Sequence, residues 1–91
     1  MSKDNTHKIT WTNKAQKDLR KIPINNVKQI LIKIDELEHP RNKWSKKIEK
    51  LAKHQYDYRM RVGNYRVMFD LNKTAKIVHI EKIGKRDGNT Y

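Results

Sequence analysis

Residues 56–71, with the sequence YDYRMRVGNYRVMFDL, carry the clearest structural pattern in the chain. Polar and apolar side chains alternate on both sides of Gly63-Asn64, and this period of two residues predicts two β-strands. A two-residue loop at Gly63-Asn64 is typical of a β-hairpin, because glycine accepts the positive φ of a type I′ or II′ turn. Such a turn places Arg61 directly opposite Arg66.

The hairpin register separates the side chains onto two faces, since directly opposed residues project on the same side of a sheet. The apolar face, which can pack against helices, collects Tyr56, Tyr58, Met60, Val62, Tyr65, Val67, Phe69 and Leu71. The opposite face collects Arg59, Arg61, Arg66, Met68, Asp57 and Asp70. Like charges that face each other destabilise a sheet, so the arginines predict a site for an anion. The alternative is a solvated face on which the two aspartates balance the arginines.

Before the hairpin, the sequence predicts a short strand and two helices. Residues 7–12 alternate between polar and apolar, and Thr12 or Asn13 can cap the helix that follows. Apolar residues at helical spacing cover 15–22 and then 24–37. This part of the chain is expected to be scaffold, with its apolar stripes in the core.

After the hairpin, residues 75–83, AKIVHIEKI, predict a third strand whose apolar character suits a central place in the sheet. Residues 41–55 are basic and poorly periodic, and predict a connection anchored by Ile48 and Leu51. Trp44 in this segment either covers the core or is an exposed aromatic, and the sequence leaves both open.

The predicted fold class is α+β, in the order β-α-α-β-β-β. An antiparallel sheet of about four strands carries a helical hairpin packed on one face. A single domain over residues 1–91 is expected, because one core usually serves ~100–200 residues.

Composition excludes several classes of protein. No apolar run approaches the ~18 residues of a membrane helix, and the first residues lack a signal-peptide pattern. The chain has no cysteine, which excludes disulfides, thiolate catalysis and cysteine-based zinc sites. We therefore expect a cytoplasmic protein with no membrane partner. Its formal charge of +12 favours a polyanionic partner, with nucleic acid as the first candidate.

Few residues are candidates for catalysis. The four histidines lack the spacing of a metal site, and neither a Gly-rich phosphate loop nor a serine nucleophile motif occurs, so no cofactor is expected. Arginines without a metal can still promote RNA cleavage, in which the 2′-hydroxyl attacks its own phosphodiester and cations stabilise the developing charge. A general base and acid are also needed. Tyr91, His54, His79 or a lysine could serve, and this choice stays open.

Positive charge is concentrated in the second part of the chain, because residues 1–40 carry a net +3 and residues 41–91 a net +9. Five of the six arginines lie in that second part. Arginine holds phosphate with a planar fork, whereas lysine offers a point charge. The residues assigned to RNA binding are Arg61, Lys46, Lys47, Lys50, Lys53 and Lys85.

Residues 56–70, residues 77–86 (IVHIEKIGKR) and Tyr91 together resemble the RelE/ParE toxin superfamily. The match is strongest to the RelE-type mRNA interferases of bacterial toxin–antitoxin systems, through an R-x-R-x-G-x-Y-R hairpin and a G-x-R after the last strand. The resemblance implies a metal-independent endoribonuclease that cleaves mRNA in the ribosomal A site, beside 16S rRNA, and so inhibits translation. It also implies a cognate antitoxin as partner, with operator DNA contacted only through the antitoxin complex.

The same resemblance implies roles for individual residues. Arg66 would contact the scissile phosphate, Arg86 would support the transition state, and Tyr91 would take part in proton transfer and base stacking. Arg59 replaces a basic residue that is lysine in some members. Asp57 stands where some members carry a second lysine, so the general base is not transferred. Two alternatives are a ParE-like toxin that inhibits DNA gyrase without nuclease activity, and a plain RNA-binding module.

Overall fold

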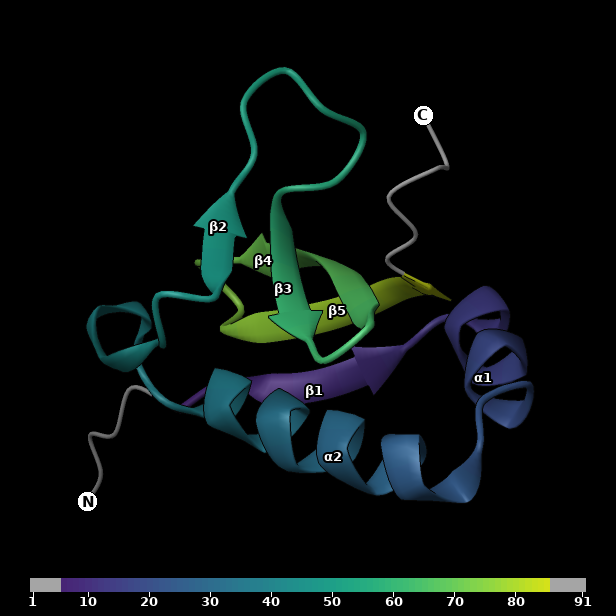
Figure 1. Ribbon diagram of the computed structural model, residues 1–91. Coiled ribbons are helices and arrows are strands. Elements are labelled where there is room, and N and C mark those ends of the chain that lie inside the picture. The colour runs from purple at the N-terminus through teal and green to yellow at the C-terminus, as the bar shows by residue number, and fades with distance from the viewer. Residues whose placement is uncertain (1–5, 86–91) are drawn as a thin grey trace.

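The computed structural model describes residues 6–85 as two α-helices and a five-stranded sheet (Figure 1). The helices are α1 (Asn13–Arg20) and α2 (Ile24–Asp35). The strands are β1 (Lys8–Trp11), β2 (Ile48–Lys50), β3 (Tyr58–Val62), β4 (Tyr65–Asn72) and β5 (Ile77–Lys85). The order across the sheet is β1-β5-β4-β3-β2, so the apolar β5 has the internal position expected for it.

Strands β3 and β4 form the predicted hairpin, and its register is the one that a two-residue turn dictates. Gly63 has a φ of 57°, in the left-handed region that glycine adopts without strain. Arg61 pairs with Arg66, and Arg59 pairs with Met68. The predicted placement of the three arginines on one face is therefore confirmed.

The α+β class is confirmed, but the sheet is mixed rather than antiparallel and has five strands rather than about four. β1 runs parallel to β5, with Ile9 beside Val78 and Trp11 beside Ile80. The whole path between β1 and β5, through the helices and the other three strands, sets this direction, and residue alternation carries no information about it. The additional strand β2 lies where a connection was expected, because three residues are too few to display a period of two.

Two strand boundaries also differ from the prediction. The last strand begins at Ile77 rather than Ala75, since Lys76 has a φ of 58° that no extended strand allows. Tyr56 lies outside β3, which begins at Tyr58. Both differences leave the pairing within the hairpin unchanged.

The helices follow the predicted signals. Thr12 caps α1, because its Oγ1 accepts a hydrogen bond from the backbone N–H of Ala15 at 3.0 Å. Pro23 directly precedes α2, which passes into a short 3₁₀ turn, Glu36–Glu38. A second 3₁₀ turn, Arg41–Lys43, leads towards β2.

The core lies between the helices and one face of the sheet (Figure 1). Its buried apolar residues are Ala15, Ile30, Ile34, Leu37, Tyr58, Met60, Val62, Val67, Phe69, Val78, Ile80 and Ile83. Trp44 covers one end of it, with its ring centroid 5.2 Å from that of Tyr58 and 5.6 Å from that of Phe69. The indole N–H donates to the carbonyl of His39 at 2.9 Å. The question that the sequence left open at Trp44 is therefore decided in favour of a core lid.

Within residues 6–85, neither helix combines the length and the apolar character that crossing a bilayer requires.

Candidate functional site

The sheet face opposite the helices carries the predicted arginines, and we call it the open face. The side chains that alternate onto it are those of Lys8, Thr10, Glu49, Arg59, Arg61, Arg66, Met68, Asp70, Asn72, Ile77, His79 and Lys82. We call Arg59, Arg61 and Arg66 the arginine cluster. Together with Glu49 they line a small hollow of about 130 Å³. Three guanidinium groups around one hollow can surround an anion such as phosphate.

Glu49 is the carboxylate that accompanies the arginine cluster. β2 pairs with β3 so that Glu49 lies opposite Arg59. The Arg59 Nε donates to Glu49 Oε1 at 3.1 Å, and Nη2 donates to the same oxygen. The hydrogen bonds and charge of Arg59, with a smaller contribution from the charge of Arg61, lower the pKa of Glu49 below 4.5. Glu49 is therefore an ionised counter-ion that an incoming anion must compete with.

The sequence did not single out Glu49, because the strand that positions it was not recognised. The alternative of a solvated face assigned the balancing role to Asp57 and Asp70 instead. Asp70 Oδ1 accepts a hydrogen bond from the backbone N–H of Asp57 at 2.8 Å. Asp57 Oδ2 in turn accepts one from the N–H of Leu71 at 3.1 Å. This reciprocal pair fastens the start of β3 to β4, so Asp57 has a structural role.

The other end of the open face carries two neighbouring carboxyl groups together with basic side chains. His79 lies opposite Asp70 in the sheet, and its Nδ1 shares a hydrogen bond with the hydroxyl of Thr10 on β1. Burial raises the pKa of Glu81 above 4.5, and a hydrogen bond to Asp70 and the charge of Asp70 raise it further. The positive charge of His79 acts in the opposite direction. The open face thus has a cationic end and an end with the neighbouring carboxyl groups of Asp70 and Glu81, which we call the acidic end, although Lys8 and Lys73 also lie there.

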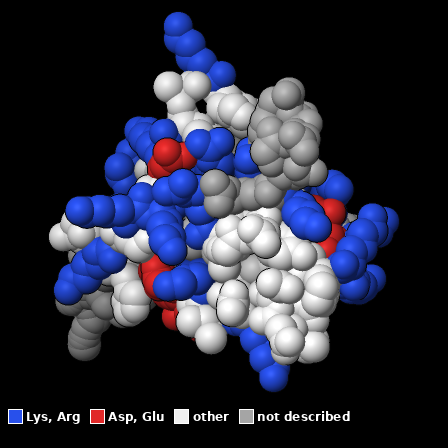
Figure 2. Space-filling model, in the orientation of Figure 1, with Lys and Arg blue, Asp and Glu red and all other residues white. Residues whose placement is uncertain are grey.

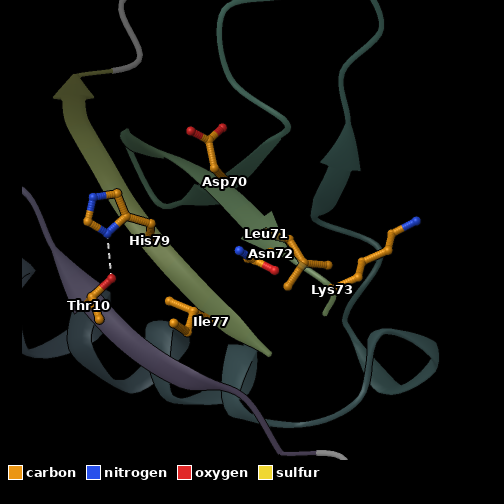
Figure 3. A pocket seen from close by; sticks show the side chains of 7 residues that line it. All are labelled: Thr10, Asp70, Leu71, Asn72, Lys73, Ile77 and His79. Atoms are coloured by element: carbon orange, nitrogen blue, oxygen red, sulfur yellow. Dashed lines mark hydrogen bonds between the residues drawn. The ribbon is translucent and has the colours of Figure 1, made fainter. Parts of the chain in front are cut away.

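A larger hollow of about 820 Å³ lies at the acidic end (Figure 3). Its lining residues come from β1, β4, β5 and the β4–β5 turn: Thr10, Asp70, Leu71, Asn72, Lys73, Ile77 and His79. No sequence motif indicated this hollow, since it depends on the parallel pairing of β1 with β5.

Three of the five lysines assigned to RNA binding lie beside the region of the arginine cluster rather than within the cluster. Lys47 adjoins the cluster, because its backbone carbonyl accepts the N–H of Arg61 at 3.1 Å. Lys46 is exposed just before β2, and Lys53 is exposed in the loop that follows it. Figure 2 shows Lys and Arg side chains gathered over the region of β2 and β3, with acidic residues among them.

Two further lysines lie on the other side of the sheet. Lys50 pairs with Tyr58, and Lys85 pairs with Tyr65, so the register places both on the face that the helices cover. Each is exposed at a strand end. The structure therefore does not bring either of them to the arginine cluster.

The remaining candidate residues fall into two groups. His54 is exposed in the loop before β3, where its Nδ1 accepts the N–H of Tyr56 at 3.3 Å, and His79 lies at the acidic end. Arg86 and Tyr91 lie outside the described residues. Among residues 6–85, no group of three or more His, Asp or Glu side chains is placed to hold a metal ion.

Comparison with known families gives one match over almost the whole chain. The family described as ParE toxin of type II toxin-antitoxin system, parDE, matches residues 9–89. No curated protein sequence matches significantly.

Several solved structures are similar to the chain. A chain of the archaeal RelE–RelB complex from Pyrococcus horikoshii OT3 has 30% identity and a TM-score of 0.74, over 93% of this chain and 99% of that chain. The RelB–RelE antitoxin–toxin complex from Methanococcus jannaschii matches with 25% identity and a TM-score of 0.67, over 85% of this chain and 90% of that chain. A mutant of E. coli toxin RelE in the free state has a TM-score of 0.69 at 21% identity, over 92% and 87% of the two chains, and supports the fold alone.

Proposed function

The chain belongs to the ParE toxin family of type II toxin–antitoxin systems, within the RelE/ParE superfamily, and on this premise we propose that it is a ribosome-dependent endoribonuclease. Its substrate would be mRNA in the A site of the ribosome, and cleavage would inhibit translation. The observation that carries this proposal is the arginine cluster, in which Arg59, Arg61 and Arg66 surround one hollow on the open face. A ribonuclease that uses no metal needs such cations at the reacting phosphate.

The proposed reaction is an internal transfer at phosphorus. The 2′-hydroxyl oxygen forms a bond to the adjacent phosphorus, and the bond from phosphorus to the 5′-oxygen breaks. The products are a 2′,3′-cyclic phosphate and a 5′-hydroxyl. Negative charge grows on the phosphoryl oxygens in the transition state. Preorganised guanidinium groups therefore stabilise the transition state more than the ground state.

Proton transfer requires a base for the 2′-hydroxyl and an acid for the leaving oxygen. Glu49 is a weak base, because the guanidinium of Arg59 lowers its pKa. His79 lies at the acidic end, paired with Asp70 across the strands rather than with an arginine. On the resemblance to RelE-type toxins, we assign proton transfer to Tyr91 and a supporting cationic role to Arg86.

We also propose a cognate antitoxin as the protein partner. The solved relatives from P. horikoshii and M. jannaschii are complexes of RelE with RelB. An antitoxin that covered the arginine cluster would keep mRNA away from it. The ribosome with its 16S rRNA would be the second partner, and operator DNA would be reached only through the antitoxin complex.

The test is Arg66→Ala, measured by cleavage of mRNA on programmed ribosomes. Loss of one cation at the phosphate should lower the cleavage rate about 100- to 1,000-fold, by analogy with loss of one oxyanion donor. Arg20→Ala is the matched control, since it removes the same charge from an exposed position on α1. Circular dichroism should show both variants folded. Cleavage by Arg66→Ala at the rate of Arg20→Ala would refute the assignment.

The family match also supports a second candidate, inhibition of DNA gyrase without nuclease activity. The two candidates differ in what a 2′-deoxy nucleotide at the cut site does. It removes the nucleophile, so it should abolish cleavage by a ribonuclease. Toxicity that survives Arg66→Ala, accompanied by DNA damage and intact mRNA, would favour the gyrase candidate.

A further inference from the structure

We propose that the 820 Å³ hollow at the acidic end of the open face receives a nucleobase of the same RNA strand whose phosphate is held by the arginine cluster. This inference rests on the proposed function and adds a base-binding subsite to it. The proposed cleavage chemistry makes no use of this hollow.

The hollow and the arginine cluster lie along one strand. Arg66, Asp70 and Asn72 on β4 are separated by even numbers of residues, so their side chains project on the same face. At about 3.4 Å per residue, Asp70 lies ~14 Å and Asn72 ~20 Å from Arg66 along β4. A single-stranded segment of a few nucleotides spans that distance.

The walls of the hollow suit a flat heterocycle with polar edges. Ile77 provides apolar surface on the open face and Leu71 also lines the hollow, while Thr10, Asn72 and His79 provide polar groups (Figure 3). Asp70 and Lys73 add charges of opposite sign. Flat bases in protein pockets are held in this way, between apolar side chains and with hydrogen bonds at their edges. The volume lies within the range of about 300–1,000 Å³ that is usual for small-molecule sites.

Hydrogen bonds within the protein orient two of these polar groups. Asn72 Oδ1 accepts the backbone N–H of Ala75 at 2.9 Å, which leaves the amide nitrogen as the donor that can meet a ligand. The hydrogen bond between His79 Nδ1 and Thr10 fixes the imidazole and leaves Nε2 as its other ring nitrogen. Both groups are therefore held by the sheet and its turn before any ligand arrives.

Charge decides which part of a nucleotide enters. The lining of the hollow carries charges of both signs, from Asp70 and Lys73, whereas the arginine cluster has three guanidinium groups and attracts a phosphate more strongly. A nucleobase is neutral at pH 7, and its amino groups can donate to carboxylates. The division of the face thus favours one direction of binding, with phosphate at the cationic end and base at the acidic end.

The experiment compares two changes that should weaken RNA binding through the same contact. One removes a base from the RNA, and the other removes the donor nitrogen of Asn72. The probe is a short RNA with a 2′-O-methyl group at the cut site, together with versions that lack one base at a time. Asn72→Asp keeps the side-chain oxygen that bonds Ala75 and removes the donor nitrogen. Asn25→Asp is the control, since it makes the same change at an exposed position on α2.

We expect that removing one particular base weakens binding to the wild type about 10-fold, a typical contribution of one held base. Asn72→Asp should bind the intact RNA with a similar loss, and base removal should then add little further loss. The Asn25→Asp protein should behave as the wild type. Equal effects of base removal in Asn72→Asp and in wild type would overturn the subsite, as would indifference to every base.

Two further arms separate the sources of failure. If wild type cleaves mRNA on the ribosome while the base-removal effects are independent of Asn72, only the subsite is refuted. If wild type cleaves no mRNA, the proposed function fails and the subsite fails with it. Saturable binding of a free nucleoside monophosphate that is unaffected by Arg66→Ala would identify a free nucleotide as the ligand and overturn the RNA subsite.

Discussion

At the scale of single residues, Glu49 limits how strongly the arginine cluster attracts an anion. Its carboxylate accepts two hydrogen bonds from Arg59 and is held ionised by them. The pair is exposed, and exposed ion pairs contribute little to stability. Its main consequence is therefore competition with an anionic ligand for Arg59.

Glu49→Gln should strengthen RNA binding severalfold at low salt, because Arg59 then becomes available to a phosphate. One more phosphate contact should also steepen the plot of log K against log salt by about 0.7. The measurement is a salt titration of binding to a non-cleavable RNA. Glu38→Gln makes the same charge change at an exposed position of the 3₁₀ turn. Equal slopes for the two variants would contradict the competition.

Glu81 makes stability depend on pH. Its pKa in the folded protein is raised above the ordinary 4.5, so the folded state binds the proton more tightly than the unfolded state. The favourable contribution of Glu81 to the free energy of unfolding is fully present below pH ~4.5 and is lost as the pH rises through the raised pKa. Glu81→Gln mimics the protonated form and should remove this loss.

Urea denaturation across the pH range tests the effect. The free energy of unfolding of wild type should fall relative to that of Glu81→Gln as the pH rises from about 4.5 towards neutrality. The difference should be constant at higher pH. Curves that stay parallel over the whole range would show that the environment of Glu81 does not distinguish its two protonation states.

At the scale of elements, α1 completes the outer edge of β5. β1 ends opposite Ile80, while β5 continues to Lys85. Beyond that point the hydroxyl of Thr12 donates to the carbonyl of Glu81 at 2.9 Å. Asp18 Oδ2 accepts the buried N–H of Ile83 at 3.0 Å. Side chains of the helix and its cap thus replace a neighbouring strand.

Asp18→Ala should therefore cost about 1–3 kcal/mol of unfolding free energy, since it leaves the N–H of Ile83 buried without its acceptor. Asp18→Asn should cost less, because the amide oxygen can still accept. Asp35→Ala is the control, as it removes an exposed carboxylate from the end of α2. Thermal or urea denaturation gives the three values. A loss for Asp18→Ala no larger than that for Asp35→Ala would contradict this role.

The hairpin could be predicted from the sequence because its determinants are local. Alternation around Gly63 sets the pairing, and the pairing sets the arginine cluster. The acidic end could not be predicted in this way, since the register between β4 and β5 shifts at Met68/Phe69. Because of this bulge, Ile80 and Ile83 are both core residues. They are three residues apart, and this odd separation breaks the period of two.

The parts of the site that the sequence missed depend on long-range contacts. Glu49 reaches the arginine cluster only because β2 pairs with β3. The hollow at the acidic end needs Thr10 on β1 and His79 on β5 to meet, and these strands are far apart in the sequence. No local pattern encodes either contact.

At the scale of the whole molecule, the formal charge of +12 acts on stability and on binding with opposite signs. The radius of gyration is 13.1 Å, comparable with the Debye length of ~10 Å at 0.1 M salt, so like charges repel one another across the molecule at low salt. This repulsion destabilises the compact state, and salt weakens it by screening. The same screening weakens attraction to RNA.

We therefore expect the melting temperature to rise by a few degrees when NaCl increases from 0.05 M to 0.5 M. Over the same range, RNA affinity should fall about 100-fold if three phosphates are contacted, since each contributes a slope of about −0.7. Thermal denaturation and RNA titration on one protein sample give both trends. A lysine outside the cluster, such as Lys17→Gln on α1, should shift the melting temperature in the same direction as salt and leave the RNA slope unchanged. A melting temperature that fell with salt would mean that attractive ion pairs, rather than net repulsion, dominate the surface.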